Sequence, residues 1–172
     1  VMSLRVRLGA RPNVLDEAPA HARVIELESP YLADATLEHL RRDAPLRPTT
    51  LSTLTPVTVC ARPNGLAHSL HLLCARAESP ARSGAQLIVL SDVGVDSART
   101  FIPSLLAVSA VHHHLLRIGL RGRVSLIVES GEPRDVHHFA ALLGYGANAI
   151  NPYLAIATAA RLAEGPITPS VA

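Results

Sequence analysis

Residues 123–153 constrain the fold most, because they contain the sequence signals of a strand, a helix and a second strand in that order. Residues 123–129 hold a short, β-branched apolar run of the kind that forms a buried strand. Residues 133–143 begin with a proline, which suits a first helical turn, then place apolar side chains at helical spacing. Gly144 and Gly146 are expected to end the helix. Residues 147–151 form the second strand. The stretch therefore predicts a βαβ unit with a right-handed crossover.

The same pattern recurs along residues 49–165 and predicts an α/β domain with a parallel sheet of about four strands. The strands are expected at residues 50–55, 86–91, 123–129 and 147–151, and the helices at residues 66–78, 103–118, 133–143 and 153–163. Residues 57–60 are the other candidate for the first strand, and Pro80 is expected to end or kink the first of these helices. Residues 92–100 are expected to form an exposed loop. This spacing is typical of an incomplete barrel or a Rossmann-like layering.

Residues 1–48 differ from the rest, because they combine many prolines, arginines and acidic residues with short apolar pieces. They predict an extended arm with one amphipathic helix, residues 34–42, which Asp34 can cap. An arm without a core of its own must lie on another surface, either of this domain or of a neighbouring one. Residues 166–172 are expected to be a tail.

The composition limits the possible functions. The 172 residues are 48% hydrophobic but only 3% aromatic, which suits the aliphatic core of stacked βα layers. A formal charge of +2 with scattered arginines argues against a nucleic-acid surface, and no apolar run approaches the roughly 18 residues of a membrane span. We therefore expect a cytoplasmic protein and, because the first residue is a valine, an excerpt of a longer one. Cys60 and Cys74 are expected to be reduced, partly buried thiols.

Any site of a parallel sheet lies at the carboxyl ends of its strands, which places three loops on one surface. The loops are residues 91–100, 130–134 and 151–153. Asp92, Asp96 and Glu129 could act there as acid or base, although solvated loop carboxylates give the same pattern. The sequence contains no GxSxG nucleophile frame and no GxGxxG or GxxxxGK[ST] phosphate motif.

Ser130 and Gly131 could hold a phosphate through backbone N–H groups at the start of a helix. Against this hypothesis, Glu129 and Glu132 flank the turn and would repel an anion. A glycine at this position is also explained by the turn alone.

The nine histidines suggest a metal site, and five of them lie in two runs, residues 112–114 and 137–138. Adjacent helical positions point about 100° apart, so such runs do not direct their imidazoles at one ion. No acid or thiol completes a ligand set nearby in the sequence. We favour histidines at the polar edges of helix packing over a metal site.

Several long collinear segments carry a family resemblance. The strongest are IPSLLAVSAVHHHLL at 102–116, VESGE at 128–132, VHHFAALLGYGA at 136–147 and NPYLA at 151–155, with shorter ones at 1–4, 8–9, 13–17, 19–23, 27–30 and 88–92. In these segments the chain resembles the central domain of the glutamate synthase large subunit. The agreement is loose at residues 49–63 and at Pro80.

The resemblance implies a part of an enzyme that makes L-glutamate from glutamine and 2-oxoglutarate. The glutaminase domain would precede this segment, and a synthase domain with FMN and an iron–sulfur cluster would follow it, so that no cofactor binds here. The central domain would join the two and help to line the ammonia path, with residues 1–30 contacting its neighbours. The candidates for tunnel-side or interface positions are Ser130, Gly131, Asn151 and Tyr153.

Three hypotheses therefore compete. The leading one is the linking domain of a glutamate synthase, without activity of its own and with an NADPH-oxidising small subunit as one further partner if NADPH is the electron donor. The second is a self-standing, barrel-like α/β enzyme that binds an anion at Ser130 and Gly131. The third is a histidine-based metal-binding module.

Overall fold

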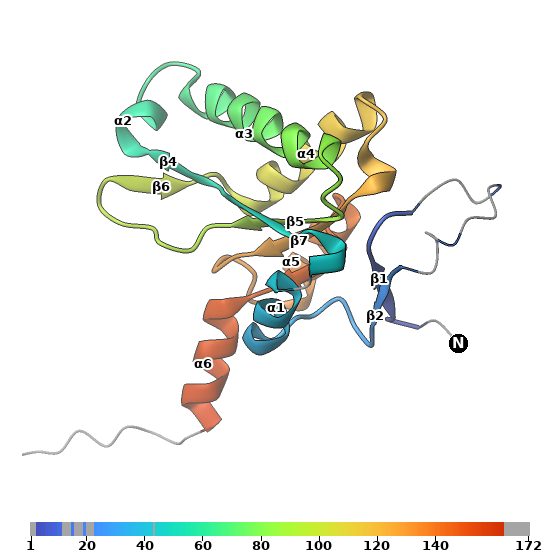
Figure 1. Cartoon of the computed structure of the whole chain (residues 1–172). Helices are drawn as coiled ribbons and strands as arrows, with labels where there is room; N and C mark the ends of the chain where they lie inside the picture. Colours follow the sequence, from blue (N-terminus) through green and yellow to red (C-terminus); the bar gives the residue numbers. More distant parts are fainter. Residues whose placement is uncertain (1–2, 12–14, 16–18, 20–22, 43, 164–172) are drawn as a thin grey trace, which may run out of the picture.

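The computed structural model describes residues 3–11, 15, 19, 23–42 and 44–163, and their centre is a four-stranded sheet (Figure 1). The strands lie in the order β3, β5, β7, β8, and every neighbouring pair is parallel. Their bounds are Thr49–Ser52 for β3, Leu87–Ser91 for β5, Ser125–Glu129 for β7 and Ala149–Asn151 for β8. The sheet stays open instead of closing into a barrel. The predicted α/β fold with four parallel strands is confirmed.

Three helices connect these strands and pack against one face of the sheet. They are α3 (Gly65–Arg82), α4 (Ser104–Arg117) and α5 (Val136–Gly144). Alternate strand residues point into this layer, because successive side chains of a strand face opposite sides. The buried cluster joins Ile88, Leu90, Leu126 and Val128 of the strands to Leu73, Val108, Val111 and Leu142 of the helices. The strands are therefore apolar on this side along their whole length.

The arm covers the other face of the same sheet. It contains the antiparallel strands β1 (Val6–Leu8) and β2 (Ile25–Leu27), the helix α1 (Asp34–Arg41) and the short 3-10 helix η2 (Ala44–Leu46). Leu87, Val89 and Ile127, the intervening strand residues, pack against Leu8, Leu37 and Leu40 of the arm. The strand pair β1 and β2 was not predicted. The arm thus lies on its own domain, and contact with neighbouring domains stays a prediction.

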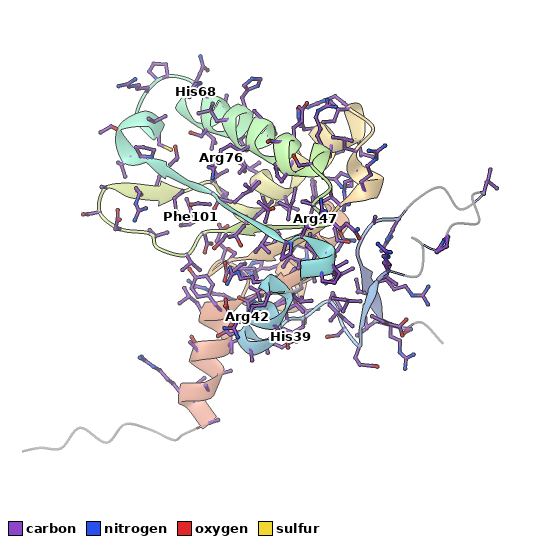
Figure 2. The ribbon with its side chains drawn as sticks, viewed as in Figure 1. His39, Arg42, Arg47, His68, Arg76 and Phe101 are labelled. Carbon is purple, nitrogen blue, oxygen red and sulfur yellow. The ribbon has the colours of Figure 1, made fainter. Side chains whose placement is uncertain are left out.

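Figure 2 labels polar side chains in the two layers that cover the sheet, the arm on one face and the connecting helices on the other. His39 and Arg42 lie on the side of α1, whereas His68 and Arg76 lie on the side of α3. The sheet separates the two pairs.

The arm also occupies the outer edge of β8. The Ile150 N–H donates to the Pro30 carbonyl at 2.8 Å, and the Leu32 N–H donates to the Ile150 carbonyl at 2.9 Å. Tyr31 forms a parallel bridge with Ile150. These contacts give the last strand of the sheet a backbone partner on both sides.

The first unit differs from the prediction, because residues 50–55 do not form one strand. Thr53 breaks it: its N–H donates to the Ser91 carbonyl at 2.8 Å, while its own carbonyl accepts from the Ile102 N–H at 3.0 Å. The chain then leaves the parallel sheet as β4 (Leu54–Pro56) and pairs antiparallel with β6 (Arg99–Phe101). The supposed loop at residues 92–100 therefore ends in a strand. Residues 57–60, the alternative strand, form the short helix α2 (Val57–Cys60).

Pro80 lies inside the last turn of α3, and the helix continues past it to Arg82, so the proline does not end the helix. The alternative, a kink at Pro80, stays a prediction. The missing N–H removes one helical hydrogen bond. The helix regains its bonding at once, since the Ser83 N–H donates to the Ser79 carbonyl at 3.1 Å. Ala77 and Ala81 on either side of Pro80 are 0% and 1% exposed, so core packing holds this turn in place.

The helix predicted to start near Pro133 begins instead at Val136. Asp135 is its N-cap, and its Oδ1 accepts the His138 N–H at 3.1 Å. An aspartate cap is a stronger start signal than a proline in the preceding turn, which explains the error. The final helix α6 (Tyr153–Ala163) is confirmed. Over the described part of the chain, no helix combines the length and apolarity that crossing a membrane requires.

Candidate functional site

Three strand ends converge on the carboxylate of Asp92, which follows β5 and is 4% exposed. The Ser130 hydroxyl donates to its Oδ2 at 2.5 Å. The Gly131 N–H points at both oxygens, at 3.2 and 3.3 Å. The Tyr153 hydroxyl donates to Oδ1 at 2.9 Å. We call these four residues the Asp92 cluster, and they join the ends of β5, β7 and β8.

The Tyr153 phenol is held in its neutral form in this cluster. Burial is the largest cause that raises its pKa, and the hydrogen bond to the Asp92 carboxylate adds to it. The neutral phenol is the donor in its hydrogen bond with the Asp92 carboxylate. Tyr153 therefore serves as an anchor and is a poor candidate for a general base.

Gly131 allows the turn to approach α6 closely. A Cβ atom placed on it would lie 2.5 Å from Leu154 Cδ1 and 3.1 Å from the Tyr153 hydroxyl. A larger residue at position 131 would therefore require the Leu154 side chain to move aside.

Glu129, the last residue of β7, forms an ion pair with the arm. Its Oε2 lies 2.6 Å from Nη2 of Arg41, and the two side chains are 9% and 25% exposed. Arg41 also pairs with Glu38 on its own helix. A carboxylate this buried requires a cation, so the pair fixes α1 against the sheet.

Asn151, the last residue of β8, connects the same edge to the start of α1. Its Nδ2 donates to the Leu32 carbonyl at 3.0 Å and to Asp34 Oδ1 at 2.7 Å. The sequence predicted Asp34 as a helix cap, but the N-cap residue is Ala33 and no side chain caps the helix. The Asp34 carboxylate accepts from Asn151 instead.

The predicted phosphate cradle is already occupied by groups of the protein. The Ser130 N–H donates to the Asn151 carbonyl at 3.0 Å, and the Gly131 N–H donates to Asp92. The Glu132 N–H donates to the Ser130 hydroxyl at 3.1 Å. A phosphate at this turn would have to displace a carboxylate that is fixed by three donors.

Of the three carboxylates considered as acid or base, two are engaged in these internal contacts and the third lies elsewhere. Asp96 lies on the exposed loop before β6 and pairs with Arg99 at 2.7 Å. The side-chain hydrogen bond from Arg99 is the main cause that lowers the pKa of Asp96. Asp96 therefore titrates as a surface carboxylate with a local partner, apart from the Asp92 cluster.

The histidines contact separate partners. His112 Nδ1 accepts from Arg121 Nε at 2.9 Å, and its ring meets that of His113 edge to face, with centroids 5.1 Å apart. His114 Nε2 lies 3.0 Å from Glu78 Oε2. Within the described ranges, no group of three or more His, Cys, Asp or Glu side chains is placed to hold a metal ion.

Burial raises the pKa of the Cys74 thiol, which keeps it protonated.

A cleft of about 250 Å³ lies between the start of α4 and the side of α5, and its lining residue Glu132 follows Gly131 of the Asp92 cluster. Its lining residues are Pro103, Ser104, Leu105, Glu132, Pro133, His138, Ala141 and Leu142. Glu132 Oε2 accepts the Ser104 N–H at 2.5 Å, so this carboxylate also has a backbone partner. The cleft is largely apolar and offers few free polar groups.

The sequence predicted that Ser130, Gly131, Asn151 and Tyr153 lie at one edge of the sheet. In the structure, Ser130, Gly131 and Tyr153 contact Asp92. Asn151 is hydrogen-bonded to the arm instead. Sequence reasoning missed Arg41 and its partnership with Glu129. The signal was present, because a glutamate closing a buried apolar strand requires a cation. The choice among sixteen basic residues was not accessible from the sequence.

Comparison with known proteins identifies what the chain is similar to. The family model described as "Glutamate synthase central domain" matches residues 1–170. The chain is 44% identical over 158 residues to the glutamate synthase [NADPH] large chain of Bacillus subtilis (strain 168), covering 92% of this chain and 10% of that protein. It is 42% identical over 160 residues to ferredoxin-dependent glutamate synthase 1, chloroplastic/mitochondrial, of Arabidopsis thaliana, again covering 92% and 10%. It thus spans about one tenth of the length of these curated relatives.

Proposed function

The chain belongs to the family of glutamate synthase central domains, and from this we propose that it is a rigid linking domain within a glutamate synthase polypeptide. It holds a glutaminase domain and an FMN-binding synthase domain in register and contributes to the wall of the ammonia path between them. The chemistry takes place in those neighbouring domains, which convert glutamine and 2-oxoglutarate to glutamate.

The observation that carries this proposal is the Asp92 cluster. At the edge where a parallel sheet normally binds its ligand, the carboxylate accepts hydrogen bonds from three donors of the same chain. Polar groups that satisfy one another stiffen a structure and leave little capacity for a substrate. This arrangement suits a support more than a catalytic centre.

The cofactors of the proposed parent enzyme fit the neighbouring domain better than this one. An iron–sulfur cluster takes about four cysteine thiolates, whereas the whole sequence has two cysteines. Cys60 is half-buried on α2 and Cys74 is buried on α3. We therefore assign FMN and the cluster to the synthase domain, with an NADPH-oxidising small subunit as a further partner if NADPH is the reductant.

The exposure of the four candidate side chains separates residues that stabilise the domain interior from residues that can face the ammonia path. Ser130 and Asn151 are each 1% exposed, so their side chains serve the interior. Tyr153 is half-buried and borders the outside of the edge. Any contact with the ammonia path is therefore expected at Tyr153 and along the cleft beside Glu132.

The contacts of the turn at Ser130 and Gly131 do not favour the alternative hypothesis, an enzyme that binds an anion there. The backbone N–H groups of Ser130, Gly131 and Glu132 all have internal acceptors. No observation favours it over the linking domain.

A chimera tests the proposal. The matching residues of the Bacillus subtilis large chain are replaced by this chain, and glutamate formed, glutamine consumed and ammonia released are measured with NADPH and 2-oxoglutarate. We expect coupled synthesis with little free ammonia, whereas an unrelated spacer of equal length should uncouple hydrolysis from synthesis. Release of most of the ammonia by the chimera, or glutamate formation by the 172-residue chain alone, would refute the linking function.

A further inference from the structure

Helix α6 (Tyr153–Ala163) is apolar but uncovered. None of its 11 residues is buried, and Leu162 near its end is 77% exposed. Its sequence, YLAIATAARLA, contains a single charged residue, Arg161. Figures 1 and 2 show it projecting away from the sheet and from the helix layer. The three crossover helices, in contrast, each bury side chains in the core.

A short apolar helix that is exposed to water is unfavourable for two reasons: it lacks stabilising packing, and its apolar side chains stay hydrated. Isolated helices shorter than roughly 12–15 residues are marginal, because most helix stability in proteins comes from packing one face. A helix that is apolar almost all round is found where it is covered. Since α6 is short and apolar, a covering surface is required to stabilise it.

The side chains of α6 form two adjacent apolar lines. Ala155, Ala159 and Leu162 recur at intervals of four and three residues, and Ile156, Ala160 and Ala163 do the same one position further along. Residues at this spacing lie above one another on one side of a helix. The alanines allow a partner's backbone or side chains to approach closely, and Leu162 can fill a pocket.

The start of α6 is anchored before any partner binds. Its first residue, Tyr153, is bonded to Asp92, and the next, Leu154, lies against Gly131. This anchor lowers the conformational entropy that docking costs, while the later turns of the helix still depend on a covering surface.

The size of α6 identifies the kind of partner. An 11-residue helix is only about 16 Å long, which is too small for the ~1,200–2,000 Å² interface that holds separate proteins together. Within one polypeptide the same contact avoids the loss of translational and rotational freedom, so a small surface is sufficient. The curated relatives extend far beyond the matched tenth of their length.

We propose that α6 is a docking helix whose apolar lines are covered by another domain of the same glutamate synthase polypeptide. The partner surface is an apolar groove with a pocket for Leu162. This inference rests on the proposed function, because it requires that this chain be one domain of a larger enzyme.

The test compares amide hydrogen exchange of residues 153–163 in the 172-residue chain and in the Bacillus subtilis chimera. We expect exchange at least tenfold slower in the chimera, and rapid exchange in the monomeric chain. Ala159→Glu together with Leu162→Glu should abolish the extra protection. Val136→Glu, at an 85% exposed apolar position that starts α5, is the matched control and should leave it unchanged.

Each outcome bears on the inference. Strong protection of residues 153–163 in the isolated monomer would overturn it even if the chimera failed to fold. A concentration-dependent dimer of the isolated chain that Leu162→Glu abolishes would assign α6 to a second copy and overturn it as well. If the chimera couples glutamine hydrolysis to glutamate synthesis while the α6 amides exchange rapidly, the docking helix is refuted and the linking function stands. If the α6 amides are protected but the chimera releases its ammonia, docking is supported and the linking function is refuted.

Discussion

The Tyr153 hydroxyl donates a 2.9 Å hydrogen bond to the Asp92 carboxylate, 61 residues earlier in the chain. This bond connects the first residue of α6 to the end of β5, and Ser130 adds the end of β7 to the same carboxylate. The group at the usual ligand position of a parallel sheet is thus used to join strands. Perturbing it should change stability.

Replacing Asp92 by asparagine should destabilise the chain by about 2 kcal/mol, because one carboxylate oxygen becomes an NH2 group that faces buried donors. Urea unfolding of the two proteins measures the difference. Asp96→Asn is the matched control, since Asp96 lies on the exposed loop, and it should cost less than about 0.5 kcal/mol. Equal losses for the two variants would show that the Asp92 cluster contributes no special stability.

Adding a methyl group at Gly131 should destabilise the chain by up to about 1 kcal/mol, because Leu154 Cδ1 lies 2.5 Å from the new Cβ and the half-exposed leucine must move aside. Leu154→Ala in the same chain should recover part of the loss by making room. Gly144→Ala is the control: it meets nothing within 4 Å at the end of α5, so it should be neutral or stabilising by up to about 1 kcal/mol. Thermal unfolding ranks the variants, and a Gly131→Ala loss that Leu154→Ala leaves unchanged would contradict the close approach.

Arg41→Met should cost about 3 kcal/mol, because it leaves the carboxylate of Glu129 buried without its cation. Glu38→Gln removes only the exposed partner of Arg41 and should cost less than about 0.5 kcal/mol. Adding Glu129→Gln to Arg41→Met should restore part of the stability. Chemical unfolding of the single and double variants measures the coupling, and strictly additive losses would refute an Arg41–Glu129 pair in solution.

Asp135 should make the start of α5 sensitive to acid. The hydrogen bond from the His138 N–H is the main cause that lowers the pKa of Asp135 in the folded chain. A carboxyl group whose folded pKa is depressed stabilises the protein above its unfolded pKa of about 3.9, and this contribution is lost as the pH falls through the folded pKa. Asparagine also caps helices but does not titrate.

The stability of the natural chain relative to Asp135→Asn should therefore decrease as the pH falls below about 4. Unfolding curves between pH 2 and 6 measure the difference. Parallel profiles for the two proteins would show that the Asp135 carboxylate is not coupled to folding.

The parts of the fold that were predictable are those whose signals are local. The strand and helix pattern between residues 86 and 163 depends on short apolar runs and helical periodicity, and apart from the missed strand β6 it was found with small errors at the ends. Thr53 was missed because a β-branched run continues through it, while the break depends on its bonds to Ser91 and Ile102. Burial of the arm depends on contacts such as Leu8 with the far side of the sheet, which leave no periodic signal.

The candidate site was predictable in location but not in chemistry. The rule for parallel sheets places Asp92, Ser130 and Tyr153 at one edge, whatever their partners. Whether a carboxylate there faces solvent, a ligand or three internal donors depends on side-chain packing between distant segments. The Arg41–Glu129 pair spans 88 residues and illustrates the same limit.

The contacts of Pro30 and Leu32 with Ile150 have a consequence for how the domain avoids aggregation. An unpaired outer strand can recruit a strand from another molecule and so begin intermolecular sheet growth. Because the arm already satisfies the backbone of β8, that route is closed on this side. The arm residues Pro30 to Leu32 thus protect the edge of β8 from pairing with a strand of another molecule.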